Sequence, residues 1–284
     1  MKQAGRRKIN IKQGLALLKW KVRLTLQYIT KRINSSKRKL PDFIIIGAMK
    51  GGTSSLFHYL SQHPDVEVSR EQETHYFAKN YHRGLNYYRS FFPLSKSNKI
   101  TGESSPYYLF HPSVPERIKK DVPNAKIIVL LRNPVDRAVS HYQMHKKLDE
   151  AENFDEALEM EEKRVGSAHA KLLSKEDVYS SAHQAFSYMA RGKYHEQISR
   201  WLKYYSLDEL VIIKSEDFFE APKNTLQKIY RALDLKEVYP KDLHPINSRK
   251  YGELSLDKKA EYMKTYQADL DQLTELLGSQ FTWS

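Results

Sequence analysis

The chain has 284 residues, of which 40% are hydrophobic and 12% aromatic, so it can bury a core and is not a disordered polypeptide. It contains no cysteine, which excludes disulfide frameworks, thiolate metal sites and cysteine nucleophiles. The formal net charge is +13, but residues 1–40 hold 13 Lys and Arg and no acidic residue, so the remaining chain has 34 basic and 34 acidic residues. The excess charge is confined to an N-terminal arm, and the composition indicates no specific nucleic-acid partner for the body.

The arm, residues 1–40, has the periodicity of a basic amphipathic helix. Apolar residues from Ile11 to Ile33 recur at spacings of three and four, with basic residues between them. Such a helix either lies on an anionic membrane surface or packs against its own domain or a partner, and both interpretations stay open. Residues 34–39 are expected to be a linker. The longest apolar run of the arm, Leu15–Leu18, is too short for a membrane span or a secretory signal. We therefore expect a cytoplasmic protein, with peripheral membrane contact through residues 1–40 as an option.

The body, residues 41–284, alternates short apolar segments with helical ones. We expect strands at 43–47, 66–68, 100–103, 126–131 and 210–213, and helices at 54–62, 115–121, 134–148, 194–205, 225–233 and 256–277. Residues 71–95 are aromatic and irregular, and residues 150–190 are mainly helical with a mobile stretch near 166–180. Strands that alternate with helices predict a three-layer, P-loop-like α/β fold with a central, mainly parallel sheet between helices.

A loop suited to phosphate follows the first predicted strand. It contains Lys50, Gly51, Gly52, Thr53 and Ser54, and a helix begins within it. Unpaired N–H groups at a helix start attract anions, glycines allow close approach, and the other side chains add a charge and two hydroxyls. The loop is not a Walker A motif, because Thr53 stands where that pattern has its Lys, which argues against magnesium-dependent NTP hydrolysis. The alternative is an ordinary strand–helix turn that contains glycines.

A second candidate site follows the strand at 126–131. Asn133 suits a helix N-cap and Pro134 the first helical position, so Arg132 is expected at the carboxyl end of the strand. Open α/β sheets bind ligands at that end. Ser140 follows two helical turns later, and a guanidinium with a hydroxyl suits a second phosphate. Taken alone, the two residues are better interpreted as a surface arginine and a helix serine.

Together these segments resemble the PAPS-dependent sulfotransferases, the family that includes the heparan sulfate sulfotransferases and many bacterial members, over roughly residues 41–284. The resemblance implies that Lys50–Thr53 matches the Lys-Gly-Gly-Thr that holds the 5′-phosphosulfate of 3′-phosphoadenosine 5′-phosphosulfate (PAPS). It also implies that Arg132–Ser140 matches the Arg-x-Pro-x-x-Arg-x-x-Ser that holds the 3′-phosphate. The implied donor-binding residues are Lys50, Gly51, Gly52, Thr53, Ser54, Arg132 and Ser140.

Between these two loops the family carries Glu-x-His-Phe-Phe, whose Glu is the proposed base. The segment from Glu73 to Phe77 is similar, with Tyr76 for the first Phe. The resemblance therefore implies Lys50 and Glu73 as the catalytic pair, with His75 the less favoured base. Without the motif, Glu73 is a surface salt-bridge residue. The spacings among His58, His63, His111, His141 and His145 do not make a convincing metal-ligand pair, so no metal is implied.

Two segments depart from the family pattern. Heparan-type enzymes often show Glu-Lys-Thr-Pro-x-Tyr, and Ser104 stands here at the Lys position, which puts heparan-like substrate handling in doubt. The family's cysteine-bounded C-terminal loop is absent, and the segment 247–251 is the candidate replacement. It places Ser248, Arg249 and Lys250 as a lid over the nucleotide, and a solvent loop is the equal alternative.

The sequence thus predicts transfer of a sulfuryl group from PAPS to a hydroxyl or amine. The expected acceptor is a carbohydrate or lipid-linked glycan, with lipids and small alcohols also open. Two alternatives remain at this point: a P-loop-type nucleoside or carbohydrate kinase, and a noncatalytic membrane-surface protein.

Overall fold

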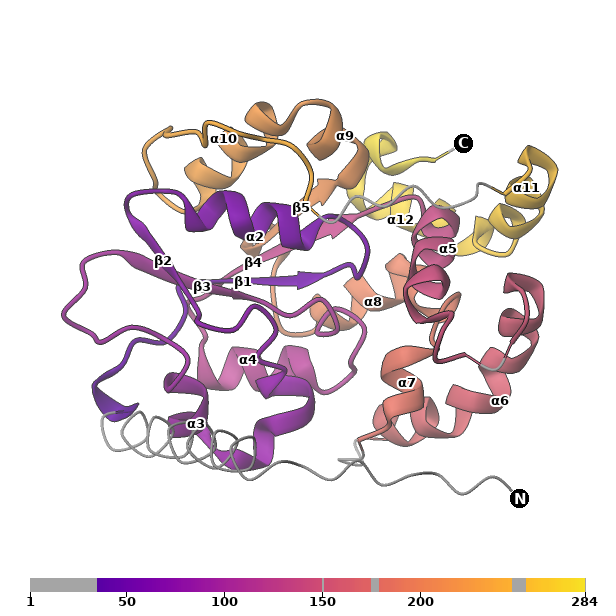
Figure 1. Cartoon of the computed structure of the whole chain (residues 1–284), viewed down its shortest axis with the longest axis horizontal. Coiled ribbons are helices and arrows are strands. Elements are labelled where there is room, and N and C mark those ends of the chain that lie inside the picture. The colour runs from indigo at the N-terminus through magenta and orange to yellow at the C-terminus, as the bar shows by residue number, and fades with distance from the viewer. Residues whose placement is uncertain (1–34, 150, 175–178, 247–253, 284) are drawn as a thin grey trace, which may run out of the picture.

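The computed structural model describes residues 35–149, 151–174, 179–246 and 254–283, and is built around one five-stranded sheet (Figure 1). The strands are β1 Phe43–Gly47, β2 Val66–Val68, β3 Ile100–Ser104, β4 Lys126–Leu131 and β5 Leu210–Lys214. Their order is β2-β3-β1-β4-β5, and every neighbouring pair is parallel. The predicted α/β fold with a central sheet between helices is confirmed.

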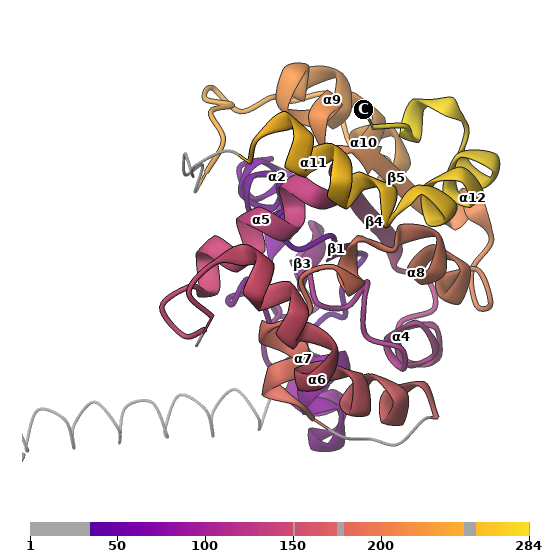
Figure 2. The ribbon, with the colours of Figure 1, turned by 90° about the vertical axis from the view of Figure 1, so that its right-hand side faces the viewer.

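Helices cover both faces of the sheet and gather beyond the carboxyl ends of its strands. They are α2 Thr53–Ser61, α3 Leu85–Arg89, α4 Val114–Asp121, α5 Pro134–His145, α6 Phe154–Leu173, α7 Ser181–Ala185, α8 Tyr194–Trp201, α9 Ser215–Glu220, α10 Pro222–Ala232, α11 Leu256–Lys264 and α12 Gln267–Leu277. In Figure 1, α2, α9 and α10 lie above the sheet, and α3, α4 and α8 lie below it. Figure 2 faces the carboxyl ends of the strands, which α5, α6, α7, α8, α11 and α12 surround.

The central strand β1 contributes side chains to two separate hydrophobic cores. Its side chains alternate between the faces, so Ile44 and Ile46 join the core on one side while Phe43 and Ile45 join the core on the other. All four side chains are fully buried. The neighbouring strand β3 needs a glycine where the ring of Phe43 packs on it, because a Cβ at Gly102 would lie 2.2 Å from that ring. These contacts fix the strand whose end carries the first candidate loop.

The expected helix over 256–277 is two helices. Tyr266 sits at the break, is buried, and donates its hydroxyl to the carbonyl of Met189 at 2.9 Å. The break lets α11 pack on α5 while α12 packs on α8. The mobile stretch expected near 166–180 is also different, because Gly166 lies inside the long helix α6; residues 175–178 lie outside the described part.

Residues 35–39, expected as part of a linker, are docked on the domain. Arg38 is 8% exposed, donates to the carbonyl of Phe92 at 2.7 Å, and its own carbonyl accepts from Arg89 at 2.6 Å. A bridge also joins Arg38 to Leu94. The ordered body therefore begins before residue 41, while residues 1–34 of the predicted arm lie outside the description. None of the described helices has the length and apolar character to span a membrane.

Candidate active site

The two predicted phosphate loops meet at the carboxyl ends of β1 and β4. These strands are neighbours, and the chain turns to opposite sides of the sheet between them, which is where open α/β sheets form ligand crevices. The backbone N–H of Ala48 donates to the carbonyl of Leu130 at 2.6 Å. Arg132 donates through Nη1 to the carbonyl of Lys50 at 3.2 Å. The two segments that the sequence singled out separately thus form one surface.

The first loop has an unusual backbone shape, with two residues in the left-handed region. Gly52 has a φ of 100° and Lys50 a φ of 70°, a conformation that costs a non-glycine residue about 1–3 kcal/mol. A Cβ at Gly51 would approach the carbonyl oxygen of Leu130 to 2.9 Å. Ser215 at the start of α9 donates to the carbonyl of Gly51 at 2.7 Å. The loop is therefore held from two sides in a strained, defined shape.

Helix α2 starts in this loop without a side-chain cap. Its N-cap residue is Gly52, and within the described residues no side chain accepts from the first N–H groups, which start at the buried Thr53. The hydroxyl of Ser54 already accepts from Gln72 at 2.9 Å. Uncapped N–H groups and the helix dipole favour an anion at this position. The geometry fits the phosphate interpretation of the loop.

The second loop is capped and fixed. Asn133 accepts through its side chain from the N–H groups of Val135 and Asp136 at 3.0 and 3.1 Å, as the sequence predicted for an N-cap. Tyr194 donates to the carbonyl of Arg132 at 2.8 Å. Ser140 lies two turns along α5 and is 7% exposed. The second loop therefore presents Arg132 from a rigid base, beside the first loop.

Glu73 and His75 lie on the loop after β2 and form a pair. The carboxylate of Glu73 is 3.1 Å from Nε2 of His75, and these side chains are 38% and 22% exposed. His75 adopts a φ of 49°, and its Nδ1 is buried without a hydrogen bond to any described residue. Because the preceding Gln72 bonds Ser54, this loop is joined to the start of α2. Glu73 is therefore accessible and belongs to the same edge.

A buried carboxylate, Glu103, holds Thr74, the residue between Glu73 and His75. Glu103, at the end of β3, is fully buried and accepts from Thr74 at 2.5 Å, Tyr88 at 2.7 Å and Ser105 at 3.2 Å. Burial raises the pKa of Glu103, while the three hydroxyl bonds oppose that rise. Removing one partner would leave a buried polar group unsatisfied, so this cluster holds the loop of Glu73 and His75 in place.

The structure adds a buried arginine that sequence reasoning missed. Arg191 is 3% exposed, donates to the sulfur of Met49 at 3.0 Å and to the carbonyl of Gln184 at 2.6 Å, and lies over the rings of Tyr107 and Phe110. Its Nε has no hydrogen bond among the described residues. Burial lowers the pKa of Arg191 to about 10, so the guanidinium stays charged at neutral pH.

The backbone that carries Arg191 is held by a second buried carboxylate. Glu161 of α6 accepts from the N–H groups of Met189 and Ala190 at 2.7 and 2.9 Å. The charge of Glu73 contributes to the electrostatics of Arg191, and it raises the pKa that burial lowers. Arg191 therefore lies within electrostatic reach of the predicted base. No local pattern in the sequence marks this residue, because its neighbours come from distant parts of the chain.

Two imidazoles of α5 lie near Lys50, one of them buried and the other partly exposed. His141 is fully buried, and neither of its ring nitrogens has a hydrogen bond to a described residue. Burial, assisted by the charges of Arg191 and Lys50 among others, holds the pKa of His141 well below its usual range. The ring of His145 lies 5.1 Å away, and Nζ of Lys50 lies 3.9 Å from the sulfur of Met144. Cations beside unsatisfied neutral groups suit an anionic ligand with further polar atoms.

Other predicted residues are placed differently or lie outside the description. Ser104, which replaces the family lysine, is fully buried, and its Oγ has no partner within the described chain. The lid candidates Ser248, Arg249 and Lys250 lie in the segment 247–253, outside the described residues. Their described neighbour Ile246 donates its N–H to Ser55 at 2.9 Å. Within the described ranges, no cluster of three or more His, Asp or Glu side chains could hold a metal ion.

Comparison with known proteins bears directly on this geometry. The model of the sulfotransferase domain family matches residues 40–272, which include both loops and the Glu73 segment. The chain belongs to the sulfotransferase domain family. Among curated relatives of this sulfotransferase, the membrane-associated sulfotransferase kil1 of Dictyostelium discoideum is 25% identical, with 86% of this chain and 66% of that protein covered. Human heparan sulfate glucosamine 3-O-sulfotransferase 6 is 31% identical, with 71% and 54% covered. The chain thus spans about half to two thirds of the length of these relatives.

A solved structure supports the same assignment over nearly its whole length. The crystal structure of a sulfotransferase from Alicyclobacillus acidocaldarius superposes with a TM-score of 0.70 at 29% identity, and 84% of this chain and 96% of that chain are covered. The family resemblance inferred from the three motifs is therefore confirmed, and with it the P-loop-like fold.

Proposed function

We propose that this sulfotransferase transfers a sulfuryl group from PAPS to a hydroxyl or amine of a carbohydrate acceptor. The observation that carries the proposal is the convergence of two loops suited to phosphate groups, joined by the 3.2 Å bond from Arg132 to the carbonyl of Lys50. A compound with phosphate groups at its 5′ and 3′ positions matches such a pair of anion sites. The family assignment favours sulfuryl transfer over the kinase and noncatalytic alternatives.

The residues present fit the donor. The uncapped start of α2 and residues Lys50–Thr53 would hold its 5′ end, and Arg132 with Ser140 would hold its 3′-phosphate. Bound PAPS supplies a sulfur centre attached to a phosphate leaving group. Ser248, Arg249 and Lys250 remain a proposed lid, supported by the bond from the nearby Ile246 to Ser55.

Two groups of the chain would act on the reacting atoms. Glu73 is exposed enough to accept the proton of the acceptor hydroxyl or amine as the new bond to sulfur forms. Lys50 would neutralise the charge that appears on the leaving phosphate oxygen as the old sulfur–oxygen bond breaks. His75, 3.1 Å from Glu73, would orient that carboxylate. Positioning and charge neutralisation account for the chemistry without a covalent enzyme intermediate.

The proposed acceptor class rests on the relatives. Several curated relatives are named as heparan sulfate sulfotransferases, and the site here combines buried cations with the accessible Glu73. A glycan acceptor is therefore favoured over a lipid or a small alcohol. Membrane contact through residues 1–40 and a cytoplasmic location stay predictions; the relative from Dictyostelium discoideum is named as membrane-associated.

The experiment is a transfer assay with sulfur-labelled PAPS against glycans, lipids and small alcohols, run on the wild type, Glu73→Gln and Glu71→Gln. Glu71 is exposed and lies two residues from the proposed base, so Glu71→Gln is the matched control. We expect Glu73→Gln to reduce kcat by ~10²–10⁴-fold and to leave binding of adenosine 3′,5′-bisphosphate unchanged, because general-base help is worth that factor. Saturation by ATP but not by the bisphosphate, with no label transferred, would contradict the proposed function.

A further inference from the structure

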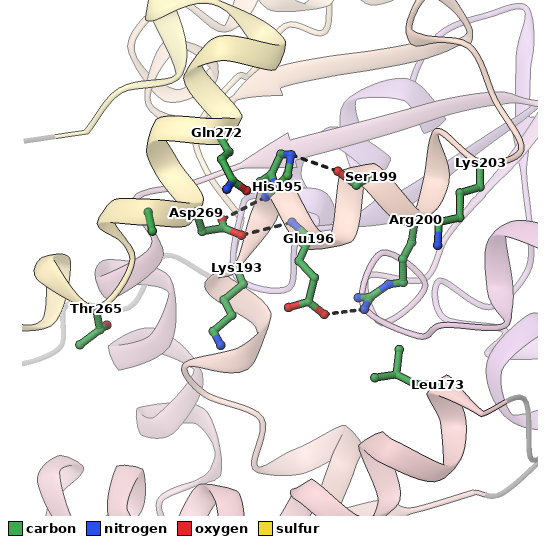
Figure 3. Close-up of a pocket in the computed structure, with 11 residues that line it drawn as sticks. Leu173, Lys193, His195, Glu196, Ser199, Arg200, Lys203, Thr265, Asp269 and Gln272 are labelled. Atoms are coloured by element: carbon green, nitrogen blue, oxygen red, sulfur yellow. Dashed lines mark hydrogen bonds and ion pairs between the residues drawn. The ribbon is translucent and has the colours of Figure 1, made fainter.

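A pocket of 580 Å³ lies on the outer side of α8, between α12 and the end of α6 (Figure 3). Its walls carry Lys193, His195, Arg200 and Lys203, all from α8 or its immediate flanks. In Figure 3 Lys193, Arg200 and Lys203 point toward the side of α8 on which Leu173 of α6 lies, while His195 lies beside Ser199 and Gln272. The known motifs of the sulfotransferase do not include any of these residues.

A second hollow of 340 Å³ continues the first. Both are lined by Leu173, Arg200 and Lys203, so they share a border. The second hollow adds Arg117 and Lys120 of α4 to the basic lining, and it adds the rings of Tyr81 and Tyr204. We call the two hollows together the flank trough.

The acidic residues of the flank trough are already engaged. Asp269 accepts from the backbone N–H groups of His195 and Glu196 at 3.0 and 3.2 Å, and so caps the start of α8. Glu196 accepts from Arg200 at 2.8 Å. The third acid, Glu116, accepts from the hydroxyl of Tyr204 at 3.1 Å.

Three lysines of the flank trough are exposed. Lys193, Lys203 and Lys120 make no ion pair or side-chain hydrogen bond with any described residue. Lys193 and Lys203 flank the 8 residues of α8, whose length is ~12 Å at the rise of a helix. The charges thus form a row and not a single point, which suits a ligand with repeated negative charges.

The flank trough is joined to the neighbourhood of Arg191 through Phe110. Arg200 donates to the carbonyl of Phe110 at 3.3 Å, and the ring of Phe110 lies beneath the guanidinium of Arg191. Lys193 follows Arg191 by two residues, and Tyr81 begins the second of the two helical turns that follow the loop of Glu73. A long molecule held at the reacting centre could therefore continue into the trough.

We propose that the flank trough is a second binding site for an acidic polysaccharide acceptor, and that it holds sugar units remote from the reacting group. The proposal rests on the proposed function, because it assigns the rest of the same acceptor chain. The lysines would pair with sulfate or carboxylate groups, and the ring of Tyr204 would pack against a sugar ring. The site then selects long acceptors over short ones without altering the transfer step.

The test compares two double charge reversals in the full-length protein. Lys120→Glu with Lys203→Glu changes the flank trough, and Lys223→Glu with Lys228→Glu changes two exposed lysines of α10 by the same charge. The probes are a heparin octasaccharide and a heparin disaccharide, measured by calorimetry at two salt concentrations. We expect the trough variant to bind the octasaccharide ~5–30-fold more weakly, since each exposed charge pair contributes little by itself. Its affinity for the disaccharide and for adenosine 3′,5′-bisphosphate should equal that of the wild type.

Each other outcome has a defined meaning. Equal octasaccharide losses in both variants would show that net charge and not the flank trough binds the glycan, which overturns the proposal. So would an unchanged octasaccharide affinity in the trough variant. Loss of binding to phosphatidylserine vesicles, with octasaccharide binding intact, would make the trough a membrane contact instead. Bisphosphate binding separates these results from a failure of the proposed function, because that function fails if the wild type does not bind the bisphosphate.

Discussion

Arg132 offers the sharpest test of the donor site, because the structure gives it two tasks. It is proposed to bind the 3′-phosphate, and it also donates to the carbonyl of Lys50 at 3.2 Å. Arg132→Ala removes both interactions. A ligand with the 3′-phosphate and a ligand without it respond differently to these two losses, so a pair of ligands can separate them.

The expected loss follows from the type of bond. A charged hydrogen bond to phosphate contributes about 1.5–3 kcal/mol, so Arg132→Ala should lower the affinity for adenosine 3′,5′-bisphosphate by ~10–150-fold. Adenosine 5′-phosphosulfate lacks the 3′-phosphate, so its affinity should fall only by the effect of the lost bond to the first loop. The bond to that carbonyl also comes from the charged guanidinium, but its loss affects both ligands alike, so it cancels in the comparison between them.

Calorimetric titration of both ligands into wild type and Arg132→Ala gives a four-point cycle, in which the coupling belongs to the 3′-phosphate alone. Arg132→Lys is the companion variant, because it keeps the charge but loses the fork geometry. Its affinity for the bisphosphate should lie between those of the wild type and Arg132→Ala. Equal losses for both ligands would show that Arg132 supports the first loop and does not hold the 3′-phosphate. No loss for either would leave Arg132 a surface residue.

Two further predictions concern stability. His183 is fully buried, bonds Tyr107 and His169, and has a pKa lowered to about 2 by burial and by nearby cations, of which Arg191 is the largest contributor. Below about pH 6.5 the unfolded chain binds a proton at His183 that the folded chain does not bind. The free energy of unfolding is therefore highest above that pH and falls by ~1.4 kcal/mol per pH unit as the pH decreases toward 2. Urea unfolding between pH 7 and 5 should show a weaker pH dependence of that free energy for His183→Asn than for the wild type, and equal dependences would contradict the assignment. For the arm, deleting residues 1–34 should leave the free energy of unfolding within ~0.5 kcal/mol, whereas deleting residues 1–40 should lower it by ~1–3 kcal/mol because the bonds of Arg38 are lost. A large loss in the shorter deletion would show that the arm packs on the domain.

The strands were predictable from the sequence because their signal is local. The runs at 43–47 and 126–131 are buried on both faces, so every residue but Lys126 is apolar or Gly, and the turn residues after them mark their ends. The first loop was legible for the same reason: glycines, a lysine and a threonine lie next to one another. Order along the chain then placed both loops at one edge, since parallel strands end on the same side.

The rest of the site depends on neighbours that the sequence does not reveal. Arg191 lies between helical segments, and its contacts with Met49 and Tyr107 join residues more than 80 positions apart in the chain. The break at Tyr266 has the same origin, because its partner Met189 lies 77 residues away. The helical sequence pattern continues through Tyr266, and only tertiary packing breaks the helix there.

The buried groups around Lys50 also explain why this site should favour an anion over a neutral ligand. Arg191 stays charged because its pKa remains about 10, whereas burial and the surrounding cations keep His141 neutral. The interior behind the first loop therefore carries positive charge without a full set of partners. Nε of Arg191 and both ring nitrogens of His141 lack hydrogen bonds within the described chain. Such an arrangement is costly in the empty protein, since a buried charge or polar group without partners loses its solvation. An anionic ligand supplies the missing countercharge and acceptors, so part of that cost becomes binding free energy when the ligand enters.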